Sequence, residues 1–158
     1  MGGEGGNLMW AFLGKSLHRV GFGCFIGSGS THSLEILKSC PMGIRSYRDL
    51  TVWNTAVQLT LEVYHITESF PQSERFGLTS QLRRAAVSIP SNIAEGHARS
   101  TRGEYRNFLS AARGSTIEVE VQLYLAEQIG YVQSPVLIKA RSYCDSISRM
   151  ISGLKRTL

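Results

Sequence analysis

Largely apolar positions recur every three or four residues along almost all of the chain after residue 48. In one segment they step through Leu109, Ala112, Thr116, Val119, Leu123 and Ala126. An α-helix turns once every 3.6 residues, so residues at this spacing line one face of a helix. The same spacing covers four segments that we expect to be helices, 49–69, 73–97, 101–130 and 134–158. Strand-like alternation and Asn-Gly hairpins are missing from them. The sequence therefore predicts an all-α fold, an antiparallel up-down-up-down four-helix bundle.

Capping residues mark where these helices are expected to begin. Asp49 opens the first segment as a cap, and Ser134-Pro135 opens the fourth, with serine as the cap and proline in the first turn. Thr101 and Glu104 have the spacing of a capping box at the start of the third. Phe70-Pro71 is expected to end the first helix, because the residue before proline avoids the α conformation.

The first 43 residues differ from the rest. They contain ten of the sixteen glycines and show no sustained period of 2 or 3.6. Glycine at this density is costly to order, which predicts a disordered leader at 1–43 and one bundle domain at 44–158. Met42 directly precedes the periodic part, so our hypothesis is that translation starts naturally there and that the upstream residues were read through by a gene prediction. A genuine disordered tail is the alternative.

Some predicted helices carry more apolar surface than one core needs. A second row on the third helix contains Ile117 and Val121, and one side of the second helix carries the residues Arg83, Val87, Pro90 and Ala94. A monomer that exposes this much apolar surface would be unusual. We therefore expect these six residues to form an interface between identical chains. The alternative is a wide core or crossed packing inside one bundle.

Pro90 lies inside the second helical segment rather than at its end. Proline lacks an N–H group and leaves the carbonyl one turn earlier without its usual donor. A proline at such a position either ends a helix or kinks it. Ser88, Ser91 or Asn92 could hydrogen-bond the local backbone groups.

Arginine dominates the charge of the periodic part. Residues 44–158 contain 14 arginines and lysines against 10 acidic residues, a net charge of +4, and 12 of the 14 are arginine. Arginine pairs bidentately with phosphate, so the excess favours an acidic partner such as RNA or DNA. The candidate nucleic-acid-binding residues gather around the second interhelix connection: Arg84, Arg99, Arg102, Arg106 and Arg113. The alternative is that they are solvated or paired with glutamates, as surface arginines commonly are.

The sequence contains no complete motif for catalysis or for metal binding. Glu62 and His65 form one Glu-x-x-His pattern, whereas a di-iron bundle needs two copies and two further glutamates. Nucleotide-binding loops and serine-hydrolase motifs are missing. The three cysteines lack metal-site spacing and fit a reducing compartment. No apolar run approaches the roughly 20 residues of a membrane span. We expect a cytoplasmic protein without enzymatic activity, metal, cofactor or membrane partner.

Several segments, taken in order, carry a family resemblance: "RDLTVWNTAVQLTLEVY", "FPQSERFGLTSQLRRA", "SQLRRAAVSIPSNIAEG", "EYRNFLSAARGSTIEVEVQL" and "IGYV". Together they resemble the bacterial 23S rRNA-intervening-sequence proteins over about 46–158. The resemblance implies a small cytoplasmic bundle without known enzymatic activity and a ring-like homopentamer with a positive surface. Pro90 and Gly114-Ser115 match the family. The match at Pro90 implies a long second helix that is kinked at Pro90 and continues beyond it. We expect Gly114 to let another helix approach closely.

A related family member, the accessory variability determinant of diversity-generating retroelements, implies nucleic acid and a reverse transcriptase as partners. We therefore expect a non-catalytic, homo-oligomeric protein that binds structured RNA through its arginines. The alternative is an oligomeric scaffold that binds a protein such as a reverse transcriptase and has no direct nucleic-acid role.

Overall fold

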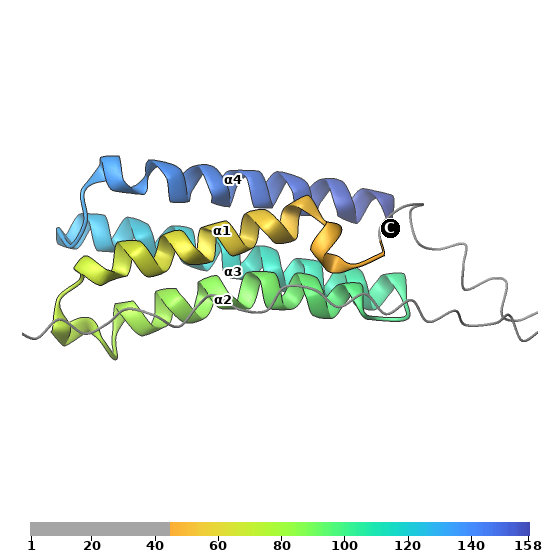
Figure 1. Cartoon of the computed structure of the whole chain (residues 1–158), viewed down its shortest axis with the longest axis horizontal. Coiled ribbons are helices and arrows are strands. Elements are labelled where there is room, and N and C mark those ends of the chain that lie inside the picture. The colour runs from red at the N-terminus through yellow and green to blue at the C-terminus, as the bar shows by residue number, and fades with distance from the viewer. Residues whose placement is uncertain (1–44) are drawn as a thin grey trace, which may run out of the picture. The chain divides into compact units, whose positions relative to one another are not determined.

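The computed structural model describes residues 45–158, which form an all-α bundle (Figure 1). Its four helices are α1 (Thr51–Ile66), α2 (Leu78–His97), α3 (Arg102–Ile129) and α4 (Ser134–Thr157). Successive helices run in opposite directions and are joined by short connections (Figure 1). Short 3₁₀ turns flank α1 at Tyr47–Asp49 and Thr67–Ser69, and another precedes α2 at Gln72–Glu74. The predicted fold class is confirmed.

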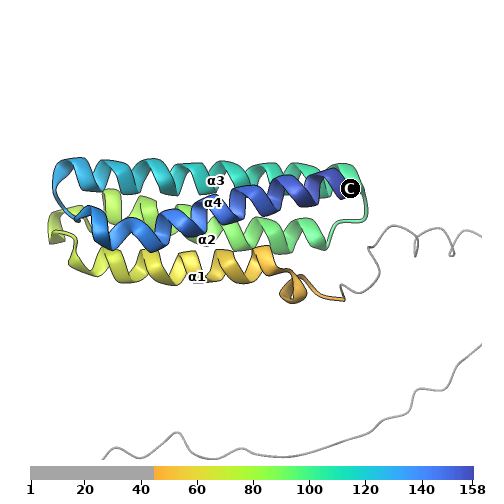
Figure 2. The same cartoon turned by 90° about the horizontal axis from the view of Figure 1, so that it is seen from above.

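The helices pack in a ring, which defines four seams. α1 packs against α2 and α4, and α3 packs against α2 and α4 (Figures 1 and 2). α1 therefore lies diagonally across from α3, and α2 lies diagonally across from α4. It follows that the α1/α2 seam and the α3/α4 seam are on opposite sides of the bundle.

The predicted apolar faces form the core. Side chains at the periodic positions of all four helices are buried, among them Leu59, Ile89, Leu123 and Ile147, none of which is exposed to solvent. Thr116 is buried, and its hydroxyl donates a hydrogen bond to the carbonyl of Ala112 at 2.9 Å. Its polar atom therefore has a partner within its own helix. The core thus follows the period of the sequence closely.

Cys144 is the one cysteine among the described residues, and it belongs to this core. Burial raises the pKa of the Cys144 thiol to about 12. The reactive thiolate is therefore a very minor species at neutral pH, and the residue acts as a small apolar side chain.

The start of α1 differs from the prediction. Asp49 accepts hydrogen bonds from the backbone N–H groups of Ser46 at 2.9 Å and Arg45 at 3.2 Å, which closes a capping box around the preceding 3₁₀ turn. Leu50 is the residue that precedes α1, and it offers no side-chain cap. Asp49 therefore caps the turn before the predicted helix, because its carboxylate reaches back along the chain rather than forward.

α2 begins at Leu78, later than the sequence predicts. Residues Gln72–Glu74 form a separate 3₁₀ turn, and Gly77 has a non-helical backbone conformation just before the helix. Glu74 accepts a hydrogen bond from the Leu78 N–H at 2.8 Å and another from the Tyr131 hydroxyl at 3.1 Å. The second bond ties this connection to the one between α3 and α4, and it raises the pKa of Tyr131.

The ends of α3 agree with the sequence, whereas the start of α4 agrees only in part. Thr101 accepts a hydrogen bond from the Glu104 N–H at 3.2 Å, as expected for the predicted cap of α3. Gly130 ends α3 in the left-handed conformation, with a φ of 88°, where glycine is favoured. Ser134 is not the cap of α4: it is the first helical residue, and its hydroxyl donates to Glu127. Pro135 lies in the first turn, as predicted.

α2 continues as a helix through Pro90. The carbonyl that proline leaves without a backbone donor is that of Ala86, four residues earlier. Thr60 of α1 donates its hydroxyl to this carbonyl at 3.0 Å, and the same hydroxyl lies 2.9 Å from the Ala56 carbonyl. Ser88, Ser91 and Asn92 donate to local backbone carbonyls as expected, those of Ala85, Val87 and Ser88, but none of the three donates to Ala86. The compensating group thus comes from a neighbouring helix. The kink stays a prediction.

Close approach between helices occurs at Gly96, near the end of α2. A Cβ atom added at Gly96 would lie 2.7 Å from Cβ of Phe108 and 2.9 Å from the Tyr105 ring, both on α3. At Gly114, by contrast, an added Cβ would meet nothing within 4 Å. Among the described glycines, Gly96 is therefore the one that allows close approach of a neighbouring helix within one chain. The sequence analysis did not predict this role for Gly96.

The expectations for the first 43 residues, including Met42 as the natural start, lie outside the described residues. The division into a leader at 1–43 and one bundle domain at 44–158 stays a prediction. None of the helices in residues 45–158 is long and apolar enough to span a membrane.

Candidate nucleic-acid interface and apolar groove

A groove lined by three arginines runs along the α3/α4 seam. It has a volume of about 480 Å³, and we call it the basic groove; its lining residues are Arg113, Ile117, Ser148, Arg149, Ser152 and Arg156. Arg149 and Arg156 are seven residues apart on α4, which places both on one face two turns apart. Arg113 faces them from α3. The lining contains no carboxylate.

The arginines of the basic groove make only weak contacts with the protein. Arg149 donates to the Ser146 hydroxyl at 3.2 Å, and Nε of Arg156 donates to the Ser152 carbonyl at 3.3 Å. Among residues 45–158, none of the three arginines forms an ion pair with a carboxylate. Their charges are therefore not neutralised by the part of the chain that surrounds them.

A lysine at the end of α4 ties the two walls of this groove together. Nζ of Lys155 donates to the hydroxyl of Ser110 on α3 at 2.6 Å. The lysine adds a further positive charge beside Arg156. The C-terminal end of α4 and the first half of α3 thus form one basic surface.

The predicted arginines divide between this surface and other places. Arg102, Arg106 and Arg113 are four and seven residues apart, so they share one exposed stripe of α3. Arg99 forms an ion pair with Glu95 at 2.5 Å, and its guanidinium carbon lies 4.6 Å from the centre of the Phe108 ring. Arg84 is exposed on α2 and donates to Gln81. Only Arg113 of the predicted set lines the groove.

Arg149 and Arg156 were missed in the sequence, because α4 has no dense run of basic residues. A signal was available in the spacing. Both residues fall outside the apolar row of Cys144, Ile147 and Ile151, and they lie seven residues apart, as residues on one polar face do. Their partnership with Arg113 depends on which helices are neighbours, which a single helix does not reveal.

An apolar groove with a volume of about 310 Å³ lies on the opposite seam, between α1 and α2. Three of the predicted interface residues, Val87, Pro90 and Ala94, contribute to its lining from α2. Tyr47 and Trp53 contribute from the other side and pack edge to face, with ring centres 5.1 Å apart. The remaining lining residues are Val57, Thr60, Leu61 and Ser91. We call this surface the apolar groove.

The other predicted interface residues lie elsewhere. Ile117 and Val121 are exposed on α3, with about half of their surface accessible to solvent, and Ile117 also lines the basic groove. Arg83 does not line the apolar groove; it contacts Thr67 and Tyr64 near the end of α1. None of the five apolar interface candidates belongs to the fully buried core of the chain. The wide-core alternative is therefore not how Val87, Ile117 and Val121 are accommodated.

The two residues of the Glu-x-x-His pattern of α1 contact different partners. Glu62 is nearly buried, and its Oε2 forms an ion pair with Nζ of Lys139 on α4 at 2.6 Å. The hydrogen bond in this pair raises the pKa of Lys139. His65 points instead toward Glu68, with the two groups 3.6 Å apart. Within the described ranges, no cluster of three or more metal-ligating side chains is present.

Comparison with known proteins identifies a family to which the chain is similar. The model of the 23S rRNA-intervening sequence protein family matches residues 48–153, well over half of the chain. A similar solved structure is that of a protein of unknown function from the S23 ribosomal protein family of Bacteroides thetaiotaomicron VPI-5482. It has a TM-score of 0.63 and 18% sequence identity, and the match covers 67% of this chain and 99% of that one. That likeness supports the fold. No curated protein matches the chain. By the extent of the family match, this chain belongs to the 23S rRNA-intervening sequence protein family.

Proposed function

We propose that this protein is a non-catalytic, self-associating cytoplasmic protein that binds structured RNA through the basic groove. The observation that carries the proposal is the set of three arginines, Arg113, Arg149 and Arg156, which line one groove without a carboxylate partner among the described residues. The family description, which refers to intervening sequences of 23S rRNA, favours RNA over DNA as the partner.

Phosphate is the chemical group that such a groove suits best. A guanidinium group donates two parallel hydrogen bonds to a phosphate, and it is less strongly hydrated than an ammonium group. Arginines that are already paired with carboxylates would have to exchange one anion for another. Because the groove arginines are unpaired, they can bind phosphates without that loss. Ser148 and Ser152 add hydroxyl groups to the lining, and hydroxyls also donate to phosphate oxygens.

The exposed stripe of α3 would extend the contact beyond the groove. Arg102 and Arg106 continue from Arg113 toward the start of the helix. Phosphates bound along such a stripe would contribute affinity but little sequence preference, because phosphates are the same for every nucleotide. Recognition would therefore depend on the shape of the RNA backbone.

The proposal is tested by fluorescence anisotropy of a labelled RNA hairpin titrated with the full chain. We expect affinity to fall at least about tenfold between about 50 and 300 mM salt, because binding releases condensed counterions. Arg113→Gln, Arg149→Gln and Arg156→Gln should each weaken binding and reduce the salt slope by about one. Arg141→Gln is the matched control, since it removes the same charge from α4 at a residue that pairs with Glu127.

Two outcomes would contradict the proposal. If RNA does not bind even at the lowest salt, the alternative of a protein-binding scaffold without a nucleic-acid role is favoured. If Arg141→Gln weakens binding as much as the groove variants do, general charge rather than this groove is responsible. Arg84→Glu tests a further point, namely whether the contact extends to α2 as the sequence predicts; its effect should be smaller than that of Arg149→Gln. A DNA hairpin of the same sequence tests the preference for RNA.

Self-association is proposed to use two apolar surfaces. One is the apolar groove with Val87, Pro90 and Ala94, and the other is the exposed row of α3 that includes Ile117 and Val121. These surfaces differ, so a contact between them joins one chain head to tail with the next. Repeated contacts of this type close into a ring when the rotation between chains permits it, which agrees with the proposed homopentamer.

A further inference from the structure

A polar pocket with two arginines lies at the end of the bundle where α1 connects to α2. Its volume is about 270 Å³, and its polar lining consists of Thr67, Glu68, Gln72, Arg75, Thr79 and Arg83. One water molecule takes up roughly 30 Å³ of liquid, so the pocket has room for an ion of several atoms together with some water. It lies near the α1/α2 connection, far along the bundle from the C-terminal end of α4 that forms the basic groove (Figure 1).

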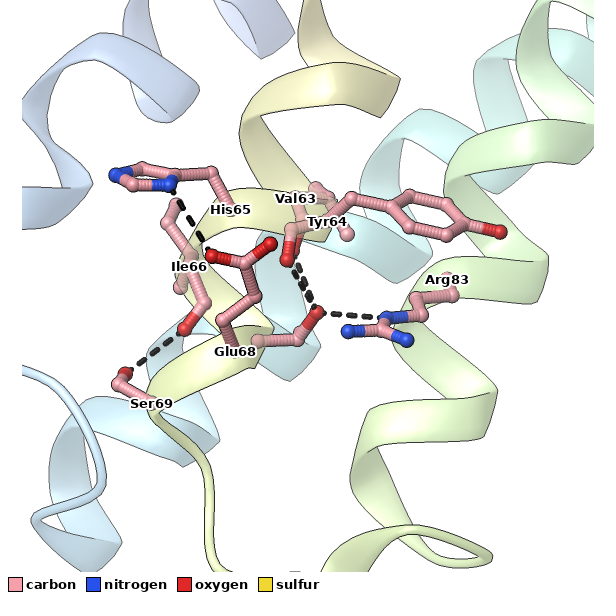
Figure 3. Close-up of polar contacts among 8 residues, drawn as sticks. Val63, Tyr64, His65, Ile66, Glu68, Ser69 and Arg83 are labelled. Carbon is pink, nitrogen blue, oxygen red and sulfur yellow. Dashed lines mark hydrogen bonds and ion pairs between the residues drawn. The ribbon is translucent and has the colours of Figure 1, made fainter. Parts of the chain in front are cut away.

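Arg83 is held in place by two neighbours on α1 and its extension. Nε of Arg83 donates to the Thr67 hydroxyl at 2.8 Å, and the guanidinium carbon lies 4.7 Å from the centre of the Tyr64 ring (Figure 3). Thr67 can accept this bond because its own proton is directed to the backbone, with the Val63 carbonyl at 2.8 Å and the Tyr64 carbonyl at 3.0 Å. The side chain is therefore oriented before any ligand arrives.

The terminal nitrogens of Arg83 have no acceptor among residues 45–158. Only Nε takes part in a hydrogen bond, as the dashed lines of Figure 3 also show. Four N–H donors of a half-buried guanidinium thus remain available. A ligand that accepts from them would not have to immobilise the arginine, since Thr67 and Tyr64 already do so.

Thr79 adds a hydroxyl group to the pocket lining, and Arg75 adds a second positive charge. Thr79 is only 8% exposed, and its hydroxyl makes no hydrogen bond within the described part of the chain. The hydroxyl oxygen is not among the buried polar atoms of the described residues that lack a partner, so solvent reaches it and it can donate to a ligand in the pocket. Thr79 precedes Arg83 by four residues, so the two share a face of α2. Arg75 lies over the Phe76 ring at 5.6 Å and pairs with no carboxylate of residues 45–158.

Glu68 is the one carboxylate in the lining, and it lies at the rim. Its side chain is 72% exposed, and its Oε2 lies 3.6 Å from Nδ1 of His65 (Figure 3). Two arginines against one solvated carboxylate leave the pocket positive. We infer that this pocket binds a phosphate oxyanion, either as inorganic phosphate or as the terminal phosphate of a nucleotide or oligonucleotide. Arg83, Arg75 and the Thr79 hydroxyl would donate hydrogen bonds to it. The site is separate from the RNA contact proposed above.

The test is isothermal titration of the full chain with inorganic phosphate, at ionic strength matched with chloride. We expect saturable binding of one phosphate per chain. Arg83→Gln should lower the affinity about tenfold or more, because charge-assisted hydrogen bonds are the strongest available to the ligand. Thr79→Val, which keeps the shape and removes the hydroxyl, should also weaken binding. Glu68→Gln should strengthen it, since it removes the negative charge at the rim.

Arg84→Gln is the matched control, because it removes the same charge from the next residue of α2, which is exposed and does not line the pocket. Its phosphate affinity should equal that of the wild type. Arg83→Gln also removes the hydrogen bond to Thr67, so it could lower the stability of the fold as well as phosphate binding. Arg75 is exposed, and Arg75→Gln therefore provides a second variant whose folding is not at risk. Absence of saturable binding, or equal losses in Arg84→Gln and Arg75→Gln, would overturn the inference.

Two further arms identify the source of the phosphate and separate this site from the basic groove. An RNA with a 5′-phosphate should bind more tightly than its 5′-hydroxyl counterpart if the ligand is a terminal phosphate, and the difference should vanish in Arg75→Gln. If the two RNAs bind equally while inorganic phosphate still binds, the ligand is the free ion. In Arg149→Gln, any phosphate bound in the basic groove should be lost, whereas the binding that depends on Arg83 should be retained, so that either proposal can fail without the other.

Discussion

Thr60 supplies from α1 the hydrogen bond that Pro90 removes from α2. The Ala86 carbonyl would normally accept from the backbone N–H of residue 90, and proline has none. The Thr60 hydroxyl, 3.0 Å away, takes that place at the wall of the apolar groove. A proline inside a helix is therefore tolerated here because a side chain of another helix satisfies the backbone.

Thr60→Val should destabilise the protein by about 1–3 kcal/mol, because it leaves the Ala86 carbonyl without a donor. In a Pro90→Ala background the same change should cost under about 1 kcal/mol, since the alanine N–H can serve that carbonyl. Urea unfolding of the four proteins in this double-mutant cycle measures the difference. Equal costs in the two backgrounds would show that Thr60 acts through Ala56 or through packing instead.

Individual capping residues could be predicted from the sequence only in part, because a capping side chain can bond on either side of its own position or to another helix. Thr101 caps α3 as expected, because its partner Glu104 lies in the same turn. Asp49 and Ser134 have the same chemistry, yet Asp49 serves the preceding turn and Ser134 donates to Glu127, seven residues away in another helix. A polar side chain has several acceptors and donors in reach, and the tertiary arrangement decides among them.

At the scale of the elements, α2 and α3 approach each other closely at Gly96. Any side chain there would occupy the space of Phe108 and Tyr105 on α3. Gly114 has helical backbone and open space around it in the single chain. The two glycines therefore form a natural pair for comparison, one required by packing and one not.

Gly96→Ala should destabilise the bundle by about 1–3 kcal/mol, because the new Cβ forces α2 and α3 apart. Gly114→Ala should instead stabilise it by about 0.5–1 kcal/mol, since alanine loses less backbone entropy in a helix. Thermal or chemical unfolding measures both changes. A loss of stability or of assembly in Gly114→Ala would indicate that another chain packs against this position, as the family resemblance led us to expect.

The helices themselves could be predicted well, whereas the grooves could not. The spacing of apolar residues depends only on the geometry of one helix, and it placed α3 within a residue of its observed bounds. A groove depends on which helices are neighbours. Arg113 was chosen for its place in a cluster along the sequence, but its partners Arg149 and Arg156 come from a helix that follows 21 residues after the end of that cluster.

At the scale of the whole molecule, apolar and basic surfaces lie on opposite seams. The apolar groove runs between α1 and α2, and the basic groove runs between α3 and α4. The apolar groove can therefore contact another chain without covering the basic groove, but Ile117 belongs both to the second association surface and to the basic groove. Self-association and RNA binding are compatible only if the chain that packs against Ile117 and Val121 leaves the three arginines accessible.

Ala94→Arg should dissociate the proposed assembly, because it places a charge and a long side chain in the apolar groove. Light scattering coupled to size-exclusion chromatography should then give the mass of a single chain. Ala98→Arg is the matched control: the same change on an exposed residue just after α2, outside the groove, should keep the wild-type mass. A wild-type mass for Ala94→Arg would place the interface on another surface.

The basic groove has a consequence for how strongly the proposed assembly would hold a long RNA. The assembly would display this groove once for each chain, and once one groove is occupied the next phosphate segment would be tethered nearby. Its effective concentration would then reach the millimolar range typical of short flexible links, which would raise overall avidity well above the affinity of one groove. Residence on the RNA would thus be set by the reach between neighbouring grooves, and a short oligonucleotide would report only the weakest unit of that interaction.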